Sequence, residues 1–92
     1  MRDGGSMTGA HPQVVLYSKP GCHLCDEMKH VVDRVLARRP FSLSVIDIST
    51  DPELGARYGL EIPVLEIDGR KAAKYRITER ELEEKLAGRR GR

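Results

Sequence analysis

The stretch that decides the fold is YSKPGCHLC, residues 17–25. It contains Cys22 and Cys25, the only cysteines of the chain, with two residues between them. The Pro20-Gly21 pair before them predicts a tight turn at the end of a strand, and the residues after them predict a helix. The two thiols are therefore expected at the first turn of a helix, where unpaired backbone N–H groups and the helix dipole favour a thiolate.

Apolar residues on both sides of this stretch have the periods of a strand and of a helix. Residues 14–17 are a short, β-prone apolar run that predicts a buried strand. After the motif, apolar residues recur at helical spacing until Pro40 ends the pattern: Leu24, Met28, Val31, Val32, Val35 and Leu36. Residues 41–48 predict a second strand, in which apolar and polar residues alternate: Phe41, Leu43 and Val45 against Ser42 and Ser44.

A short helix is predicted between the second strand and the third. Asp51 suits its N-cap, Pro52 suits its first position, and Gly59 suits its end. Pro63 then precedes a third strand at residues 64–67.

The last third of the chain predicts a hairpin followed by a helix. Asp68-Gly69 is a strong signal for a two-residue hairpin turn, and residues 70–75 would form the returning strand. Residues 78–81 form a capping box that begins the last helix. The element order is therefore β-α-β-α-β-β-α, which indicates an α/β fold.

Length and composition limit the classes of function. Ninety-two residues make one domain, which we place at residues 13–87, between a disordered lead-in at 1–12 and a basic disordered tail at 88–92. A net charge of +2 with 4% aromatic residues provides no stacking platform for nucleic acid. No apolar run reaches the roughly 18 residues of a membrane span, and the lead-in has no signal-peptide core, so we expect a cytoplasmic monomer.

The motif and its surroundings resemble the active-site segment of glutaredoxins. Ile62-Pro63-Val64, followed by a hairpin, resembles the cis-proline segment of the thioredoxin superfamily. The chain is identified as a divergent glutaredoxin-like protein with a CHLC motif. The resemblance implies a minimal thioredoxin fold with a four-stranded mixed sheet flanked by three helices. His23-Leu24 replaces a Pro-Tyr pair, residues 72–76 lack the Gly-Gly pair of glutathione-binding members, and Thr78 stands where those members have an acidic cap.

The expected activity is thiol–disulfide exchange on protein or small-molecule disulfides. Cys22 would be the nucleophile, and Cys25, one turn deeper on the same helical face, would resolve the mixed disulfide. Substrate binding is assigned to five residues near the thiols: Lys19, His23, Leu24, Ile62 and Pro63. Lys19 matches the family's basic residue near the glutathione carboxylate, and a cis bond at Pro63 would turn the backbone of Ile62 toward the sulfurs.

Partners and alternatives follow from the same residues. The expected partner is a disulfide-containing protein or glutathione, which is also a candidate reductant, with no bound cofactor and no metal ligand. A metal or iron–sulfur module is one alternative, but two thiolates supply only half of a tetrahedral zinc site, so it would need glutathione or a dimer. A non-catalytic thioredoxin-fold interaction domain with idle cysteines is the other.

Overall fold

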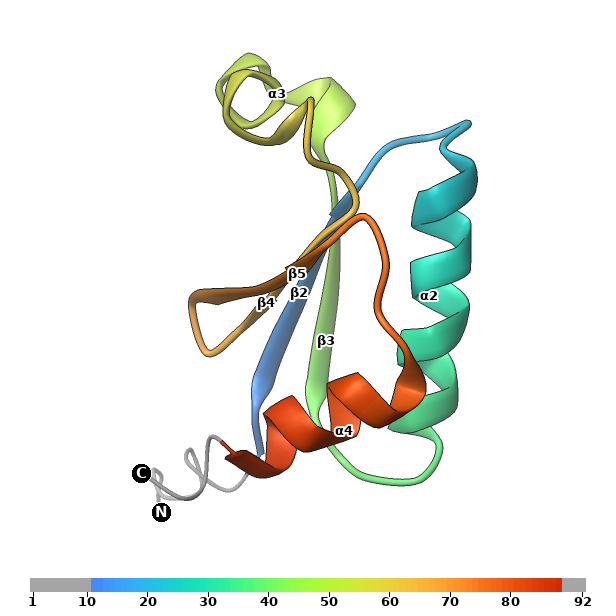
Figure 1. Cartoon of the computed structure of the whole chain (residues 1–92). Coiled ribbons are helices and arrows are strands. Elements are labelled where there is room, and N and C mark those ends of the chain that lie inside the picture. The colour runs from blue at the N-terminus through green and yellow to red at the C-terminus, as the bar shows by residue number, and fades with distance from the viewer. Residues whose placement is uncertain (1–10, 89–92) are drawn as a thin grey trace.

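Four strands form one mixed sheet in the computed structural model of the chain, which describes residues 11–88. They are β2 (Gln13–Ser18), β3 (Ser42–Asp47), β4 (Val64–Ile67) and β5 (Arg70–Lys74), in the order β3-β2-β4-β5 across the sheet (Figure 1). β2 and β3 are parallel, whereas β4 is antiparallel to both of its neighbours. The parallel pair requires a crossover connection, which the first helix provides.

Within residues 11–88, two α-helices and a short 3-10 helix connect the strands, and a third α-helix follows the last strand. They are α2 (His23–Leu36), η1 (Ile48–Thr50), α3 (Pro52–Tyr58) and α4 (Glu79–Gly88). In Figure 1, α2 runs alongside the strands, α4 lies at the lower end of α2, and α3 lies beyond the upper end of β3. The predicted fold class, with a four-stranded mixed sheet and three helices in the order β-α-β-α-β-β-α, is confirmed.

The predicted turn and cap residues act locally as expected. The Asp51 carboxylate accepts hydrogen bonds from the N–H groups of Glu53 and Leu54, at 2.9 and 3.3 Å, and so caps α3. Asp68 and Gly69 have φ values of 52° and 83°. Both lie in the left-handed region that the tightest two-residue hairpin turn requires, which explains the aspartate-glycine pair between β4 and β5.

The start of α4 is held by its capping box and by an arginine that lies just after the end of α2. The Thr78 hydroxyl accepts from the N–H of Glu81 at 3.0 Å, and the Glu81 carboxylate accepts from the N–H of Thr78 at 2.9 Å. Arg38 forms ion pairs with Glu79 at 2.8 Å and Glu83 at 2.7 Å. These contacts fasten the end of α2 to α4.

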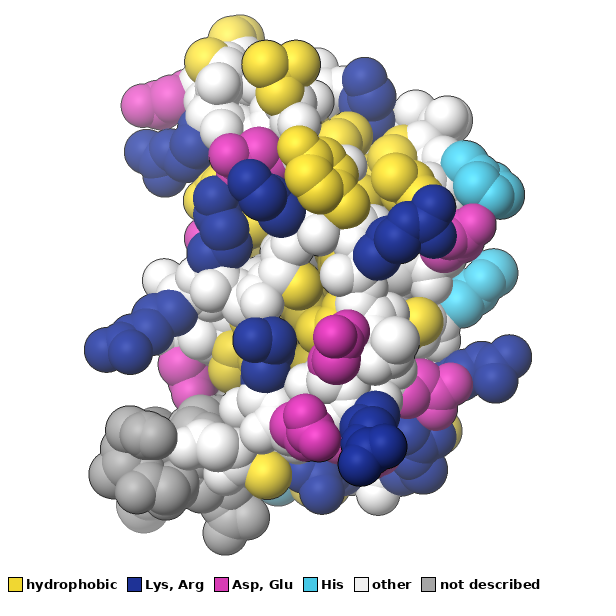
Figure 2. Space-filling model, in the orientation of Figure 1, with side chains coloured by type: hydrophobic (Ala, Val, Ile, Leu, Met, Phe, Trp, Pro, Cys, Tyr) yellow, Lys and Arg dark blue, Asp and Glu magenta, His cyan; other side chains and the backbone are white. Residues whose placement is uncertain are grey.

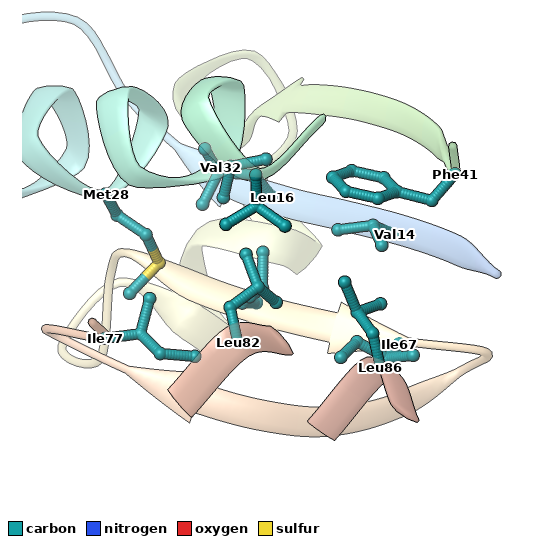
Figure 3. Packing of buried hydrophobic residues seen from close by; sticks show 11 residues of the cluster. Val14, Leu16, Met28, Val32, Phe41, Ile67, Ile77, Leu82 and Leu86 are labelled. Atoms are coloured by element: carbon teal, nitrogen blue, oxygen red, sulfur yellow. The ribbon is translucent and has the colours of Figure 1, made fainter. Parts of the chain in front are cut away.

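The main hydrophobic core lies between the sheet and the two helices α2 and α4. Its side chains converge from β2, α2, α4 and β4 (Figure 3). The fully buried members with the largest volumes include Leu16, Met28, Leu65, Leu82 and Leu86. Five of the six apolar positions of the predicted helical pattern belong to this cluster or pack against it: Met28, Val32 and Val35 are buried in it, and Val31 and Leu36 pack at its margin.

A second, smaller buried cluster lies at the other end of the sheet. It consists of Cys25, Ile48, Tyr58, Ile62 and Val64. These residues come from α2, η1, α3, the segment before β4 and the first residue of β4, so the cluster joins several elements at this end of the sheet. The cysteine motif therefore belongs to this end of the molecule.

The second strand differs in detail from the prediction. β3 ends at Asp47, and a 3-10 helix follows where the strand was expected to continue to Ile48. The Asp47 carboxylate accepts from the N–H of Ser49 at 2.8 Å, which bends the chain out of the sheet. Val45 belongs to the apolar set of the alternating pattern, yet 48% of it is exposed. β3 is an edge strand with a neighbour on one side only, so the cover over its side chains is incomplete.

The predicted lead-in at 1–12 and tail at 88–92 lie outside the described residues, except for His11, Pro12 and Gly88. Pro12 is buried, and its carbonyl accepts from the N–H of Ser42 at 2.9 Å, while Gly88 is the last residue of α4. Within the described range, none of the helices has the length and apolar character needed to cross a membrane.

Candidate active site

Cys22 and Cys25 are joined in a disulfide at the beginning of α2. Cys22 is the N-cap of the helix, with extended backbone angles, and its sulfur accepts a hydrogen bond from the N–H of Cys25 at 3.1 Å. Gly21 precedes it with a φ of 77°, in the left-handed region that glycine adopts without steric cost. The predicted turn thus places the sulfur of Cys22 beside the N–H groups at the start of the helix.

The two sulfurs differ in their access to solvent. Cys22 is half-buried, whereas Cys25 is 3% exposed and lies in the second buried cluster beside Ile62. An external disulfide can therefore reach the sulfur of Cys22. The buried sulfur of Cys25 can react with the sulfur of Cys22, to which it is bonded. The spacing of the two cysteines predicted that Cys25 would lie one turn deeper than Cys22, and the difference in exposure agrees with that prediction.

Ile62 and Pro63 lie next to the disulfide in the fold. Ile62 is 9% exposed and shares the second buried cluster with Cys25, and Pro63 is buried beside it. The peptide bond between these two residues is cis. The carbonyl of Pro63 accepts a hydrogen bond from the N–H of Tyr75 at 2.8 Å. The structure thus brings the two segments of the predicted site together, although they are some forty residues apart in the chain.

The other predicted site residues lie around the motif at the surface. Lys19 is exposed on the turn before Cys22, and Leu24 is half-buried in the first turn of α2. The side chain of His23 is 85% exposed, and its Nε2 lies 2.7 Å from a carboxylate oxygen of Glu27. His23 is therefore held along the helix by a residue four positions later.

Glu27 has a wider role than the sequence indicated. Besides His23, its carboxylate contacts the guanidinium of Arg76 at 3.5 Å. Arg76 belongs to the connection between β5 and α4, so Glu27 joins this connection to α2. The spacing of four between His23 and Glu27 was a local signal for the first contact. The second contact depends on the tertiary fold and has no local signal.

Two tyrosines and a glutamate form a polar group beside the second cluster. The rings of Tyr17 and Tyr58 are stacked with centroids 4.3 Å apart, and Tyr58 shares the buried cluster with Cys25. The hydroxyl of Tyr17 donates to Glu66 at 3.3 Å, and that of Tyr58 donates to the other carboxylate oxygen at 2.9 Å. Burial, with the negative charge of Glu66, raises the pKa of Tyr17 from 10.0 to about 12.

Tyr75 and Leu60 form an exposed apolar surface near Pro63. Leu60 is 93% exposed and Tyr75 is 42% exposed. The Tyr75 hydroxyl donates to the carbonyl of Leu60 at 2.9 Å, and the Lys74 ammonium lies 5.6 Å from the centre of the ring. The sequence analysis assigned no function to these residues, because their meeting depends on how β5 returns beside the segment before β4.

No group of three or more potential metal-binding side chains (His, Cys, Asp or Glu) occurs within residues 11–88. A structural tetrahedral metal site uses four ligands. Within residues 11–88, no such set forms around the two sulfurs.

A mixed four-stranded sheet, with a helix that begins at the disulfide after the first strand, gives this chain a thioredoxin-like fold with a Cys-x-x-Cys motif. Residues 13–87 match the family described as Glutaredoxin-like domain (DUF836), and the chain belongs to this family. It is also similar to the uncharacterized protein Rv0508 of Mycobacterium tuberculosis (strain ATCC 25618 / H37Rv). That similarity is 26% identity over 83 residues, which covers 85% of this chain and 86% of the relative.

Solved structures with the same fold include a relative and a thioredoxin. Target protein XcR50 from X. campestris is 28% identical, with a TM-score of 0.70 over 82% of this chain and 96% of that protein. Desulfothioredoxin from Desulfovibrio vulgaris Hildenborough, in its reduced form, is 31% identical, with a TM-score of 0.63 over 88% of this chain and 83% of that protein. Fold, family and disulfide together support a redox-type function.

Proposed function

We propose that this protein is a thiol–disulfide oxidoreductase that acts by dithiol exchange on disulfides of proteins or small molecules. The observation that carries the proposal is the disulfide at the N-cap of α2, with Cys22 accessible and Cys25 buried. A structural disulfide would not need this asymmetry, because both of its sulfurs could be buried.

The position of Cys22 favours its thiolate. In the reduced protein, the N–H of Cys25 can donate to the Cys22 sulfur as it does in the oxidised form, where the distance is 3.1 Å. The positive end of the helix dipole adds to this stabilisation. A thiolate, and not a thiol, attacks a disulfide, so Cys22 serves as the nucleophile.

The exchange takes place in two steps that balance in atoms and electrons. The Cys22 thiolate attacks one sulfur of the substrate disulfide, a mixed disulfide forms, and the other substrate sulfur leaves as a thiolate. The thiol of Cys25 then loses its proton and attacks the Cys22 sulfur, which releases the second substrate sulfur. The substrate has gained two electrons, and the Cys22–Cys25 disulfide has formed. Two molecules of an external thiol, for which glutathione is a candidate, return the pair to its reduced form and are themselves joined in a disulfide.

Substrate binding is proposed for the residues around the sulfurs. The place of Ile62 and Pro63 beside Cys25 supports pairing between the backbone of Ile62 and an extended substrate, as in strand addition. Lys19, His23 and Leu24 surround the accessible sulfur and would contact the substrate from the side of the motif. We propose further that the protein acts in the cytoplasm as a monomer and without a bound cofactor.

The test is the reduction potential of the Cys22–Cys25 pair. The protein is equilibrated in buffers of increasing thiol-to-disulfide ratio, free thiols are tagged with a mass label, and the oxidised fraction is read by intact mass. A reversible two-electron transition between about −280 and −180 mV supports exchange. Resistance to oxidation over this range, or protection of the thiols that a chelator removes, would favour a binding module. Cys22→Ser is the control, since it cannot form the disulfide.

A further inference from the structure

A groove lies between α2 and the connection from β5 to α4. Its volume is about 200 Å³, and its apolar lining includes Met28, Val31 and Ile77. It begins within one helical turn of the disulfide, because Glu27 both lines the groove and contacts His23 of the motif. The volume is below the roughly 300 to 1,000 Å³ of pockets that enclose a whole small-molecule ligand. The groove therefore suits a single side chain.

The charged groups at the groove discourage an anionic ligand. Glu27 and Glu81 each contribute a negative charge, and Arg76 contributes one positive charge that is already paired with Glu27 at 3.5 Å. The capping box also occupies the N–H groups of Thr78 and Glu81 at the start of α4, which would otherwise be available to a carboxylate. Glutathione carries two carboxylates, so it is poorly matched to this groove.

An exposed apolar surface continues the groove toward Pro63. Tyr75 lines the groove, and its hydroxyl donates at 2.9 Å to the carbonyl of Leu60, a residue that is 93% exposed. Tyr75 has a φ of 70°, a conformation that bulky residues rarely adopt and that is found preferentially at functional sites. Figure 2 shows hydrophobic side chains gathered on the upper part of this face, with Lys and Arg side chains on both sides.

We propose that the preferred substrate is a disulfide within an extended polypeptide, and that an apolar side chain next to the substrate cysteine enters this groove and packs on Leu60 and Tyr75. Glutathione is then the poorer substrate. The proposal rests on the exchange activity proposed above and names its substrate class. Cys22 forms the mixed disulfide with the polypeptide sulfur while the apolar side chain holds the chain in place, and Cys25 then releases the polypeptide as a thiol.

The experiment compares three substrates that share one leaving group. In each substrate, nitrothiobenzoate is joined by a disulfide to a second thiol. The second thiol is a pentapeptide with Phe on both sides of its cysteine, the same peptide with Asp at those two positions, or glutathione. The Cys22 thiolate of the reduced protein attacks the sulfur of the peptide or of glutathione, and the nitrothiobenzoate that leaves is followed by its absorbance. Rates with dithiothreitol correct for the intrinsic reactivity of each substrate. We expect the Phe peptide to react at least about tenfold faster than glutathione or the Asp peptide, which corresponds to about 1.4 kcal/mol.

Two variants locate the origin of the preference. Leu60→Ser should lower the ratio of the Phe-peptide rate to the glutathione rate by about threefold. Because Leu60 is 93% exposed, the substitution removes no buried contact and should leave folding unchanged. Val45→Ser is the matched control, because Val45 is also an exposed apolar residue but belongs to the β3 edge, and it should leave the ratio unchanged.

The outcomes separate the two proposals. Equal rates for the Phe peptide and glutathione, or equal ratios in the two variants, overturn the polypeptide preference but leave the exchange activity intact. Failure of all three substrates to react faster with the wild-type protein than with Cys22→Ser overturns both proposals.

Discussion

Tyr17 and Tyr58 share one carboxylate: their rings are stacked with centroids 4.3 Å apart, and their hydroxyls donate to the two oxygens of Glu66. The three residues come from β2, α3 and β4, so the group joins three elements beside the disulfide cluster. Its hydrogen bonds require protonated tyrosine hydroxyls, because these hydroxyls are the donors. The stability of this end of the molecule should therefore respond to pH and to the loss of any one partner.

The first prediction concerns alkaline pH. The folded protein holds the pKa of Tyr17 at about 12, above the value of 10.0 expected in the unfolded chain. Between these two values, the unfolded chain has lost the proton that the folded protein retains, so stability should fall as pH rises from about 10 to 12. Below pH 10 the contribution is fully present. Urea unfolding midpoints measured across this range check the prediction, and Tyr17→Phe should show a smaller decrease than wild type.

The second prediction concerns Glu66. Replacement of Glu66 by Ala leaves the buried hydroxyl of Tyr58 without its acceptor, and we expect a loss of about 1–3 kcal/mol in the free energy of unfolding. Absorbance titration of the tyrosines should also show the pKa of Tyr17 moving down toward 10, because the negative charge that helps to raise it is gone. Glu84→Ala, on the exposed side of α4, should change stability by less than about 0.5 kcal/mol. An equal loss in both variants would contradict the role given to Glu66.

The third prediction separates the roles of the two cysteines. With Cys25→Ser, the mixed disulfide between Cys22 and a protein substrate should accumulate, because no second thiol can release it. With Cys22→Ser, no mixed disulfide should form and the exchange rate should fall to that of the uncatalysed reaction. Intact mass spectrometry after brief incubation with an oxidised protein substrate distinguishes the two results. Accumulation on Cys25 in the Cys22→Ser variant would reverse the assignment.

The fourth prediction concerns the ion pairs of Arg38 with Glu79 and Glu83, which connect the end of α2 to α4. They are exposed, so their stabilising effect should be small and sensitive to salt. Arg38→Ala should lower the melting temperature slightly in dilute buffer, and the difference from wild type should disappear in about 1 M salt, where screening acts within roughly 3 Å. A difference that persists at high salt would mean that packing of the arginine side chain, and not its charge, carries the effect.

The parts of the fold that could be predicted depend on residues close together in the chain. Asp51 caps a helix through N–H groups two and three residues later, and the capping box of α4 acts over three residues. Asp68-Gly69 determines its turn through the backbone angles of those two residues alone. The cysteine motif is another local feature that could be predicted, because the N–H of Cys25 donates to the sulfur of Cys22 within one helical turn.

The parts that escaped prediction depend on strand register. Tyr17 faces Val64 across β2 and β4, which makes Glu66 its diagonal neighbour two positions along the partner strand. Nothing within a few residues of Tyr17 indicates this partner, and the contact between Tyr75 and Leu60, 15 positions apart, likewise has no local signal. The exposure of Val45 likewise follows from the edge position of β3, which its own alternating pattern does not encode.

The separation of the two buried clusters has a consequence for how this protein can change over evolutionary time. The main core holds the sheet to α2 and α4 and includes neither cysteine, whereas the sulfurs belong with the smaller cluster at the other end. Substitutions at His23 or Leu24 therefore leave the main core untouched. Selection can retune the chemistry of the motif for a new partner without first acquiring compensating mutations for folding, because the two residues between the cysteines lie outside the main core.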